Sequence, residues 1–243
     1  VTNAVYLNGN QIQDIRPAIN QEVAVIFDWL LPDDHGYSSG ATYQFELPDK
    51  LKVPSQMVGT LIGDIGTFVV DTDGMITFTF NESIEDNLQW DGWFFVWLSF
   101  DAAKMEDGLE QEIEFADQAA TKIQVHFANQ AVDDLIKTGN ADKNNFNSDE
   151  IEWTVDLNLG EQAIANAVLE DTLPSGLSAP ADVEICELQI QVNGSVKETA
   201  VCNTQPVVPT ADGFSLNLGN ITKAYRLTYT TGVSAPTAAP YTN

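Results

Sequence analysis

The chain has 243 residues, of which 10 are Lys or Arg and 36 are Asp or Glu, giving a formal net charge of −26. A hydrophobic fraction of 44% can form real cores, which excludes general disorder. The acidic surface repels phosphate backbones and anionic lipids, so binding to nucleic acid or to a membrane surface is disfavoured. A macromolecular partner is expected to be basic or to be recognised through apolar and hydrogen-bonding contacts, although acidity that only maintains solubility explains the charge equally well.

The first half of the chain alternates apolar and polar residues in short runs, which is typical of half-buried strands. The runs EVAVIFDWLL and ATYQFELP follow this pattern, and GTFVV–DTDG–MITFTF predicts a hairpin over residues 66–80. The most aromatic stretch is WDGWFFVWLSFD, for which we expect a central strand packed on both faces, with Trp90, Trp93 and Trp97 in the core. No apolar run approaches the roughly 20 residues of a membrane span. The sequence that begins at Val1 does not read as a signal peptide, so we expect a fragment excised from a mature ectodomain.

The same strand pattern begins again after ANQAVDDL, which has little periodicity and is interpreted as a linker. Alternating runs follow in IEWTVDLN, NAVLEDTLP, VEICELQIQV, GFSLNLG and AYRLTYTTGV. Trp153 alternates with polar neighbours, which points its side chain inward. The fold is therefore predicted to be all-β, with two tandem β-sandwiches of ordinary domain size over residues 1–130 and 131–243.

Several of these stretches resemble a known family. The first half resembles the first immunoglobulin-like subdomain of Gram-positive cell-wall-anchored adhesins in ATYQFELPDKLKV, GTFVVDTDGMITFTF and WDGWFFVWLSFD. The second half resembles their collagen-adhesin-type subdomain in IKTG, IEWTVDLN, VLEDTLPSGL and ITKAYRLTYTTGV. The resemblance covers nearly the whole chain. It implies two immunoglobulin-like sandwiches that bind a ligand outside the cell, on a stalk tethered to the cell wall, in a virulence-associated adhesin.

The resemblance also implies a covalent cross-link. In the collagen-adhesin subdomain, a lysine on the first strand is joined to an asparagine on the last, assisted by an acid on a middle strand; the matching positions are Lys137, Asp171 and Asn243. Burial lowers the pKa of a lysine and makes its amine nucleophilic, whereas a buried carboxyl stays protonated and polarises the asparagine carbonyl. Attack releases ammonia once per molecule, so no enzyme with turnover is expected. The alternative is an exposed Lys137 in a linker and an Asp171 that only caps a strand, and Lys143 is a poor substitute in its polar loop.

The ligand is not determined by these residues. Collagen-binding relatives carry an aromatic residue before the lysine and Arg-x-Phe-x-Asn on the next strand, where this chain has Ile136 and then Glu152, Thr154 and Asp156. Collagen, fibrinogen-like peptides and other host matrix or plasma proteins therefore stay open, for a fragment expected to be a monomer. One rival is a load-bearing stalk or pilus-like module without its own ligand. Another is a carbohydrate-active β-sandwich, which needs a cleft with two carboxylates.

The chain has only two cysteines, Cys186 and Cys202, and they flank a turn at Asn193-Gly194. A three-residue loop over 193–195 would make them face each other, which predicts a disulfide in an extracellular setting; two buried free thiols are the alternative. Two Cys and two His provide few ligands for a zinc site, and no cofactor is expected. Residues 71–74 (DTDG) resemble half of a calcium loop, but no bidentate acid follows in frame. We predict a hairpin turn there and leave calcium binding by an acidic loop open.

Overall fold

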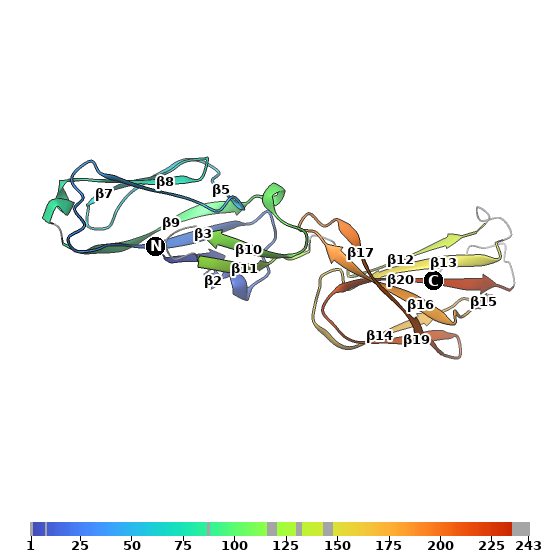
Figure 1. The fold of residues 1–243 in the computed structure, drawn as a ribbon. Helices are drawn as coiled ribbons and strands as arrows, with labels where there is room; N and C mark the ends of the chain where they lie inside the picture. The colour runs from blue at the N-terminus through green and yellow to red at the C-terminus, as the bar shows by residue number, and fades with distance from the viewer. Residues whose placement is uncertain are drawn as a thin grey trace. The chain divides into compact units, whose positions relative to one another are not determined.

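The computed structural model describes residues 2–7, 9–86, 88–115, 121–129, 133–142 and 148–234. The chain divides into two compact units, residues 1–128 and 129–243, each built from antiparallel strands (Figure 1). Helical structure in the described residues is limited to three short 3-10 turns: η1 (Ile12–Asp14), η2 (Glu82–Asp86) and η3 (Ala102–Lys104). None of the helices described is long and apolar enough to cross a membrane. The prediction of an all-β chain with two tandem immunoglobulin-like sandwiches is confirmed.

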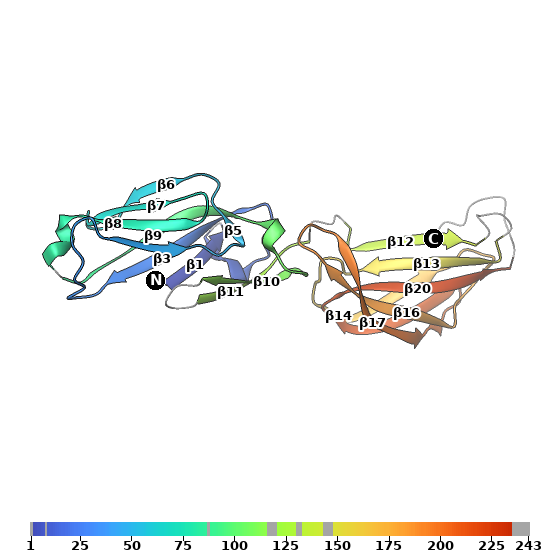
Figure 2. The same cartoon turned by 45° about the horizontal axis from the view of Figure 1, so that its top comes forward.

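The described residues of unit 1 form eleven strands: β1 (Thr2–Leu7), β2 (Asn10–Gln11), β3 (Glu22–Leu31), β4 (Thr42–Glu46), β5 (Leu51–Lys52), β6 (Met57–Thr60), β7 (Gly66–Val70), β8 (Met75–Phe80), β9 (Trp90–Phe100), β10 (Glu110–Phe115) and β11 (Thr121–His126). One sheet has the order β2-β1-β3-β9-β5 and the other β4-β8-β7-β6. The strands β10 and β11 pair with each other and lie side by side in Figure 2. The predicted hairpin is formed by β7 and β8. Its DTDG segment is a turn in which Gly74, at φ 90°, donates its N–H to the Asp71 carbonyl at 3.0 Å.

The facing sides of the two sheets of unit 1 meet in an aromatic core. Phe94 of β9 lies 5.0 Å from Phe27 of β3 and 4.6 Å from Phe68 of β7 between ring centroids. The prediction that β9 is packed on both faces is wrong, because alternate residues of β9 point away from the core and Trp93 and Trp97 are about half exposed. In a two-layer sandwich each sheet buries one face. The density of aromatic residues in β9 conceals the two-residue period of that arrangement.

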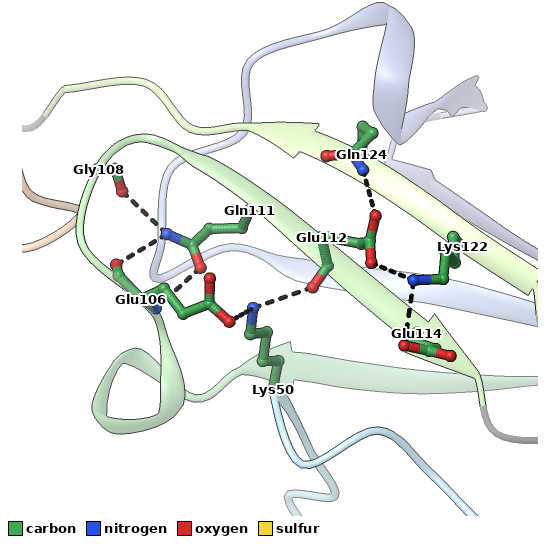
Figure 3. A network of polar contacts seen from close by, with 8 residues as sticks. All are labelled: Lys50, Glu106, Gly108, Gln111, Glu112, Glu114, Lys122 and Gln124. Atoms are coloured by element: carbon green, nitrogen blue, oxygen red, sulfur yellow. Dashed lines mark hydrogen bonds and ion pairs between the residues drawn. The ribbon is translucent and has the colours of Figure 1, made fainter.

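A polar network holds the loop that leads into β10 (Figure 3). Gln111, only 1% exposed, accepts a hydrogen bond from the Glu106 N–H at 2.9 Å and donates to the carbonyl oxygens of Glu106 and Gly108 at 2.8 and 2.9 Å. Nearby, the buried Lys50 donates to the Glu112 carbonyl at 2.9 Å. The buried amide of Gln111 thus has partners for its oxygen and for both N–H groups, which fixes the loop without leaving an unpaired polar atom.

In unit 2, the part of the chain that the structure describes forms nine strands: β12 (Leu135–Ala141), β13 (Glu150–Leu157), β14 (Ile164–Thr172), β15 (Leu177–Ser178), β16 (Asp182–Ile190), β17 (Val196–Pro206), β18 (Val208–Pro209), β19 (Gly213–Ile221) and β20 (Ala224–Val233). One sheet has the order β12-β13-β20-β16-β17, with β15 paired to the end of β20, and the other is β14-β19-β18. The core between them includes Val155 and Leu227 from the first sheet and Phe214 and Leu216 from the second. Trp153 is 5% exposed, as its alternation predicts.

Cys186 of β16 and Cys202 of β17 are directly opposed and joined by a disulfide. The turn differs from the one assumed in the sequence analysis. The loop is 192–194, closed by a hydrogen bond from the Gln191 N–H to the Ser195 carbonyl at 2.9 Å. The cysteines still meet because a β-bulge lies between Cys186 and Leu188, where β17 advances four residues while β16 advances two.

Candidate functional site

Lys137 and Asp171 form an ion pair inside unit 2. Lys137 lies in β12 and Asp171 in β14, so the two side chains come from different sheets and meet between them. The Lys137 Nζ atom is 2.8 Å from Oδ1 and 2.7 Å from Oδ2 of Asp171. Their side chains are only 15% and 8% exposed. The lysine is therefore part of a strand rather than of a linker, and its ammonium group is largely withdrawn from water.

Aromatic rings enclose this ion pair. The Lys137 Nζ atom lies 4.6 Å from the ring centroid of Trp153 and 5.6 Å from that of Tyr229. The Tyr229 ring packs edge-on against Phe214, which lies directly opposite Asp171 in the β14–β19 register. The apolar rings exclude water, while their faces attract the cation. The site therefore combines an amine and a carboxyl that are both largely shielded from water.

Tyr229 hydrogen-bonds directly to the acid of the pair. Its hydroxyl donates to Oδ2 of Asp171, the oxygen that also receives Lys137. Burial raises the pKa of Tyr229 well above its usual value, and the hydrogen bond to Asp171 and the charge of that residue add to the effect. The hydroxyl consequently remains a donor at any pH at which the protein would normally be handled.

Gly139 makes room for the aromatic cover over the lysine. It lies opposite Trp153 in the β12–β13 register, and a Cβ atom there would come within 2.7 Å of the indole ring. The other edge of the indole is held by a hydrogen bond of 2.9 Å from Trp153 Nε1 to Thr231 Oγ1. The short segment from Lys137 to Gly139 therefore supplies both the amine and the space for the ring that covers it.

The residues expected at this site are not all described by the structure. Lys137 and Asp171 are in contact, whereas Asn243 lies outside the described residues. The sequence analysis missed Tyr229 and Gly139 as parts of the site. The strand alternation in AYRLTYTTGV could have pointed Tyr229 inward, but nothing in the sequence indicated which buried group its hydroxyl would meet.

A second arrangement of charges lies on the outer face of the β12-β13-β20-β16-β17 sheet. Arg226 of β20 lies opposite Asp156 of β13 and donates to its carboxylate from Nε at 2.7 Å and from Nη2 at 2.8 Å. Arg226 also pairs with Glu198, and the hydrogen bond to Asp156 is the main cause of its raised pKa. In the sequence comparison, Asp156 stands where collagen-binding relatives carry the asparagine of their Arg-x-Phe-x-Asn motif, and Glu152 stands in place of the arginine. In the structure, a cation from the neighbouring strand occupies the same part of the face.

Two larger cavities lie elsewhere in the described residues. One, of about 340 Å³, is lined mainly by aromatic and apolar residues of unit 1, with His35 at its wall. The other, of about 480 Å³, lies in unit 2 and has a single carboxylate, that of Asp134. Neither holds the pair of carboxylates that a glycosidase requires. Across the residues for which coordinates are described, no three His, Cys, Asp or Glu side chains are grouped so that they could hold a metal ion.

Two family descriptions match the chain, one in each unit. Residues 16–110 match the bacterial Ig domain, and residues 132–243 match the collagen binding domain. No curated protein matches the chain in sequence.

Several solved structures also match the chain. The collagen binding domain of the Erysipelothrix rhusiopathiae surface protein RspB is 12% identical, with 96% of this chain and 81% of that chain covered and a TM-score of 0.37. The collagen adhesin of S. aureus is 13% identical, with the same two coverages, 96% and 81%, and a TM-score of 0.36. A serine-rich repeat adhesion glycoprotein of Streptococcus agalactiae is 9% identical, with 99% and 93% covered and a TM-score of 0.39.

Proposed function

We propose that this chain, a bacterial Ig domain followed by a collagen binding domain and thus a Gram-positive collagen-adhesin region, binds a host matrix protein and locks its second unit with a covalent bond. The coarse assignment to a non-enzymatic cell-surface adhesin rests on the collagen binding domain. Attachment of the parent protein to the cell wall and a monomeric state are parts of the proposal. No cofactor is needed for either activity.

The contact between Lys137 and Asp171 is the observation that supports the covalent bond. A proton passes from the Lys137 ammonium to the Asp171 carboxylate, to which it already donates at 2.7 Å. The neutral Nζ then attacks the side-chain carbonyl carbon of Asn243, while the Asp171 carboxyl donates a hydrogen bond to its oxygen. The C–N bond of the asparagine amide breaks, a proton from Nζ moves to the departing nitrogen, and neutral ammonia leaves. An amide remains between Lys137 and Asn243, and Asp171 is left protonated.

Such a bond would be useful to an adhesin under tension. A pull along the chain would be carried by a covalent link instead of by strand hydrogen bonds that each contribute about 1 kcal/mol net. The link would close a loop of roughly a hundred residues, and in the chain-entropy model a disulfide closing such a loop stabilises by about 4.7 kcal/mol.

The test of the cross-link is the intact mass of the reduced protein, including Asn243. Wild type is expected to be lighter than its sequence by one ammonia, whereas Lys137→Ala should have its full calculated mass. Lys223→Ala, which removes another lysine of unit 2, is the matched control and should keep the mass deficit. A folded wild-type protein of full mass would refute the cross-link and leave Lys137 and Asp171 as a structural ion pair.

For the ligand, we propose a matrix protein held on the outer face of the β12-β13-β20-β16-β17 sheet. The support is the collagen binding domain together with the polar and charged groups on this face, including Thr154 and the Asp156–Arg226 pair. The test measures binding of wild type and Thr154→Arg to immobilised collagen and fibrinogen. It shows which protein is bound and whether this face of the sheet binds it. If neither protein binds while the mass deficit is present, the load-bearing stalk without its own ligand becomes the better reading.

A further inference from the structure

An exposed row of aromatic side chains lies on unit 1. Its members, Trp93, Phe95 and Trp97, are alternate residues of β9 and are 53%, 48% and 50% exposed. We call them the aromatic row. Neighbouring ring centroids are 6.4 Å apart, both from Trp93 to Phe95 and from Phe95 to Trp97. Single exposed apolar residues are normal, but contiguous apolar patches on a protein surface mark interaction sites.

The neighbouring strand β3 places apolar residues beside two rings of the aromatic row and an acidic residue at one end of it. On β3, Ala24 lies opposite Trp97 and Ile26 lies opposite Phe95. At the other end, the exposed Asp28 lies opposite Trp93, and the exposed Asp91 precedes Trp93 on the same face of β9. The patch therefore offers three ring surfaces in a line, with negative charge at one end.

The charges of this surface argue against a second copy of the chain as its partner. Each copy would bring a net charge of −26, and each aromatic row would bring its own acidic end. Lys52, opposite Ser99 near the far end of β9, is 3.4 Å from Asp101 and so already has an acidic partner. A basic partner would relieve the repulsion that a second copy would create.

The ring orientations argue against a flat sugar chain. The planes of Trp93 and Phe95 differ by 25°, but those of Phe95 and Trp97 differ by 88°, so the three rings do not form one platform. A guanidinium group needs only one ring face at a time, because it stacks on individual aromatic rings. An extended peptide places every second side chain on the same side, about 6.6 Å apart, which is close to the spacing of the rings.

From these observations we propose that the aromatic row binds an extended basic peptide segment whose alternate arginines stack on Trp93, Phe95 and Trp97, with the acidic end attracting its charge. The site is on unit 1 and does not depend on the cross-link or on the ligand face of unit 2. It would give the adhesin a second contact with a basic region of a partner protein.

The proposal is tested with a fluorescent dodecapeptide of alternating arginine and serine, titrated into the whole chain in physiological salt. The triple variant Trp93→Ala/Phe95→Ala/Trp97→Ala should weaken binding about tenfold, because it removes the stacking contacts and keeps the net charge. The control Val58→Ala/Val201→Ala/Val208→Ala removes exposed apolar side chains elsewhere at the same net charge and should bind like wild type. A lysine–serine peptide should bind more weakly than the arginine peptide.

Equal affinity of the triple variant and wild type for the arginine peptide would overturn the proposal, since attraction by net charge alone would then explain the binding. Circular dichroism checks that the variant is folded, and the single variant Trp97→Ala, with an expected smaller loss, replaces it if it is not. Self-association of wild type that the triple variant abolishes would assign the surface to a second copy instead. Binding of a glucan hexasaccharide in preference to the peptide would assign it to carbohydrate.

Discussion

Tyr229 and Asp171 are joined by a hydrogen bond that crosses from β20 to β14. The same carboxylate oxygen receives the Lys137 ammonium, so the phenol orients the acid against the amine. Removing a partner from a buried carboxylate costs about 1–3 kcal/mol, or more for a charged group. Tyr229 is therefore expected to act as a positioning residue in cross-link formation rather than as a group that touches the reacting atoms.

The first prediction is that Tyr229→Phe slows the loss of ammonia without abolishing it. The phenyl ring should keep the packing against Phe214, while the Asp171 carboxyl loses one donor and becomes less well oriented. The measurement is a time course of intact mass in freshly purified protein, beside Tyr225→Phe as the control from the same strand. Complete cross-linking of both variants at the wild-type rate would show that the phenol has no part in the reaction.

The second prediction concerns alkaline pH. The pKa of Tyr229 is raised in the folded protein, so the folded state holds a proton that the unfolded state releases above about pH 10. The stabilising effect is complete below that pH and is lost as pH rises, by up to about 1.4 kcal/mol per pH unit. Thermal unfolding between neutral pH and pH 11 should therefore show a steeper loss of stability in wild type than in Tyr229→Phe. If wild type and Tyr229→Phe lose stability equally as the pH rises, the raised pKa of Tyr229 would be contradicted.

Much of the fold could be predicted because strand alternation is a local property. The β7–β8 hairpin and the inward position of Trp153 follow from a two-residue period and from turn residues close in sequence. The pairing of Lys137 with Asp171 depended on family resemblance, because the two residues are far apart in the chain. Tyr229 was missed because an inward-pointing tyrosine shows only that its hydroxyl needs a partner and does not identify that partner.

The error over β9 has a different physical cause. Trp93 and Trp97 are as apolar as the buried residues between them, so composition alone could not separate the two faces of the strand. Only the number of layers in the sandwich decides which face is covered. The disulfide shows the converse. The prediction that Cys186 and Cys202 face each other was correct, although the loop assumed for it was not. The β-bulge that brings the two cysteines into register has no evident sequence signal, so the loop could not be predicted correctly.

The third prediction is that Gly139→Ala destabilises unit 2 by about 1–3 kcal/mol, the usual range for overpacking. The added methyl group would lie 2.7 Å from the Trp153 ring. The ring cannot move freely, because its Nε1 donates a hydrogen bond to Thr231. Urea unfolding followed by tryptophan fluorescence measures the change, with Thr138→Ala on the exposed side of β12 as the control. Wild-type stability in Gly139→Ala would mean that the indole has room to shift.

The fourth prediction concerns the Gln111 network of unit 1. Gln111→Ala removes partners from the backbone groups of Glu106 and Gly108 and should cost about 1–3 kcal/mol. Gln124, whose amide donates to Glu112 at the surface at 2.7 Å, provides the matched control in the same region (Figure 3). Gln124→Ala should change stability by no more than about 0.5 kcal/mol. Similar losses for the two variants in chemical unfolding would show that burial of Gln111 does not set its contribution.

The fifth prediction concerns reduction of the Cys186–Cys202 disulfide, which closes a loop between residues 16 positions apart. For a loop of this length, the chain-entropy model gives a stabilisation of about 3 kcal/mol. Reduced protein should therefore unfold at lower urea concentration than oxidised protein, with the change confined to unit 2. Cys186→Ala/Cys202→Ala should resemble the reduced protein and respond to no reductant. If reduction leaves the unfolding midpoint unchanged, the remaining β16–β17 hydrogen bonds already hold the hairpin, and the disulfide protects the edge strand against local opening rather than the fold against global unfolding.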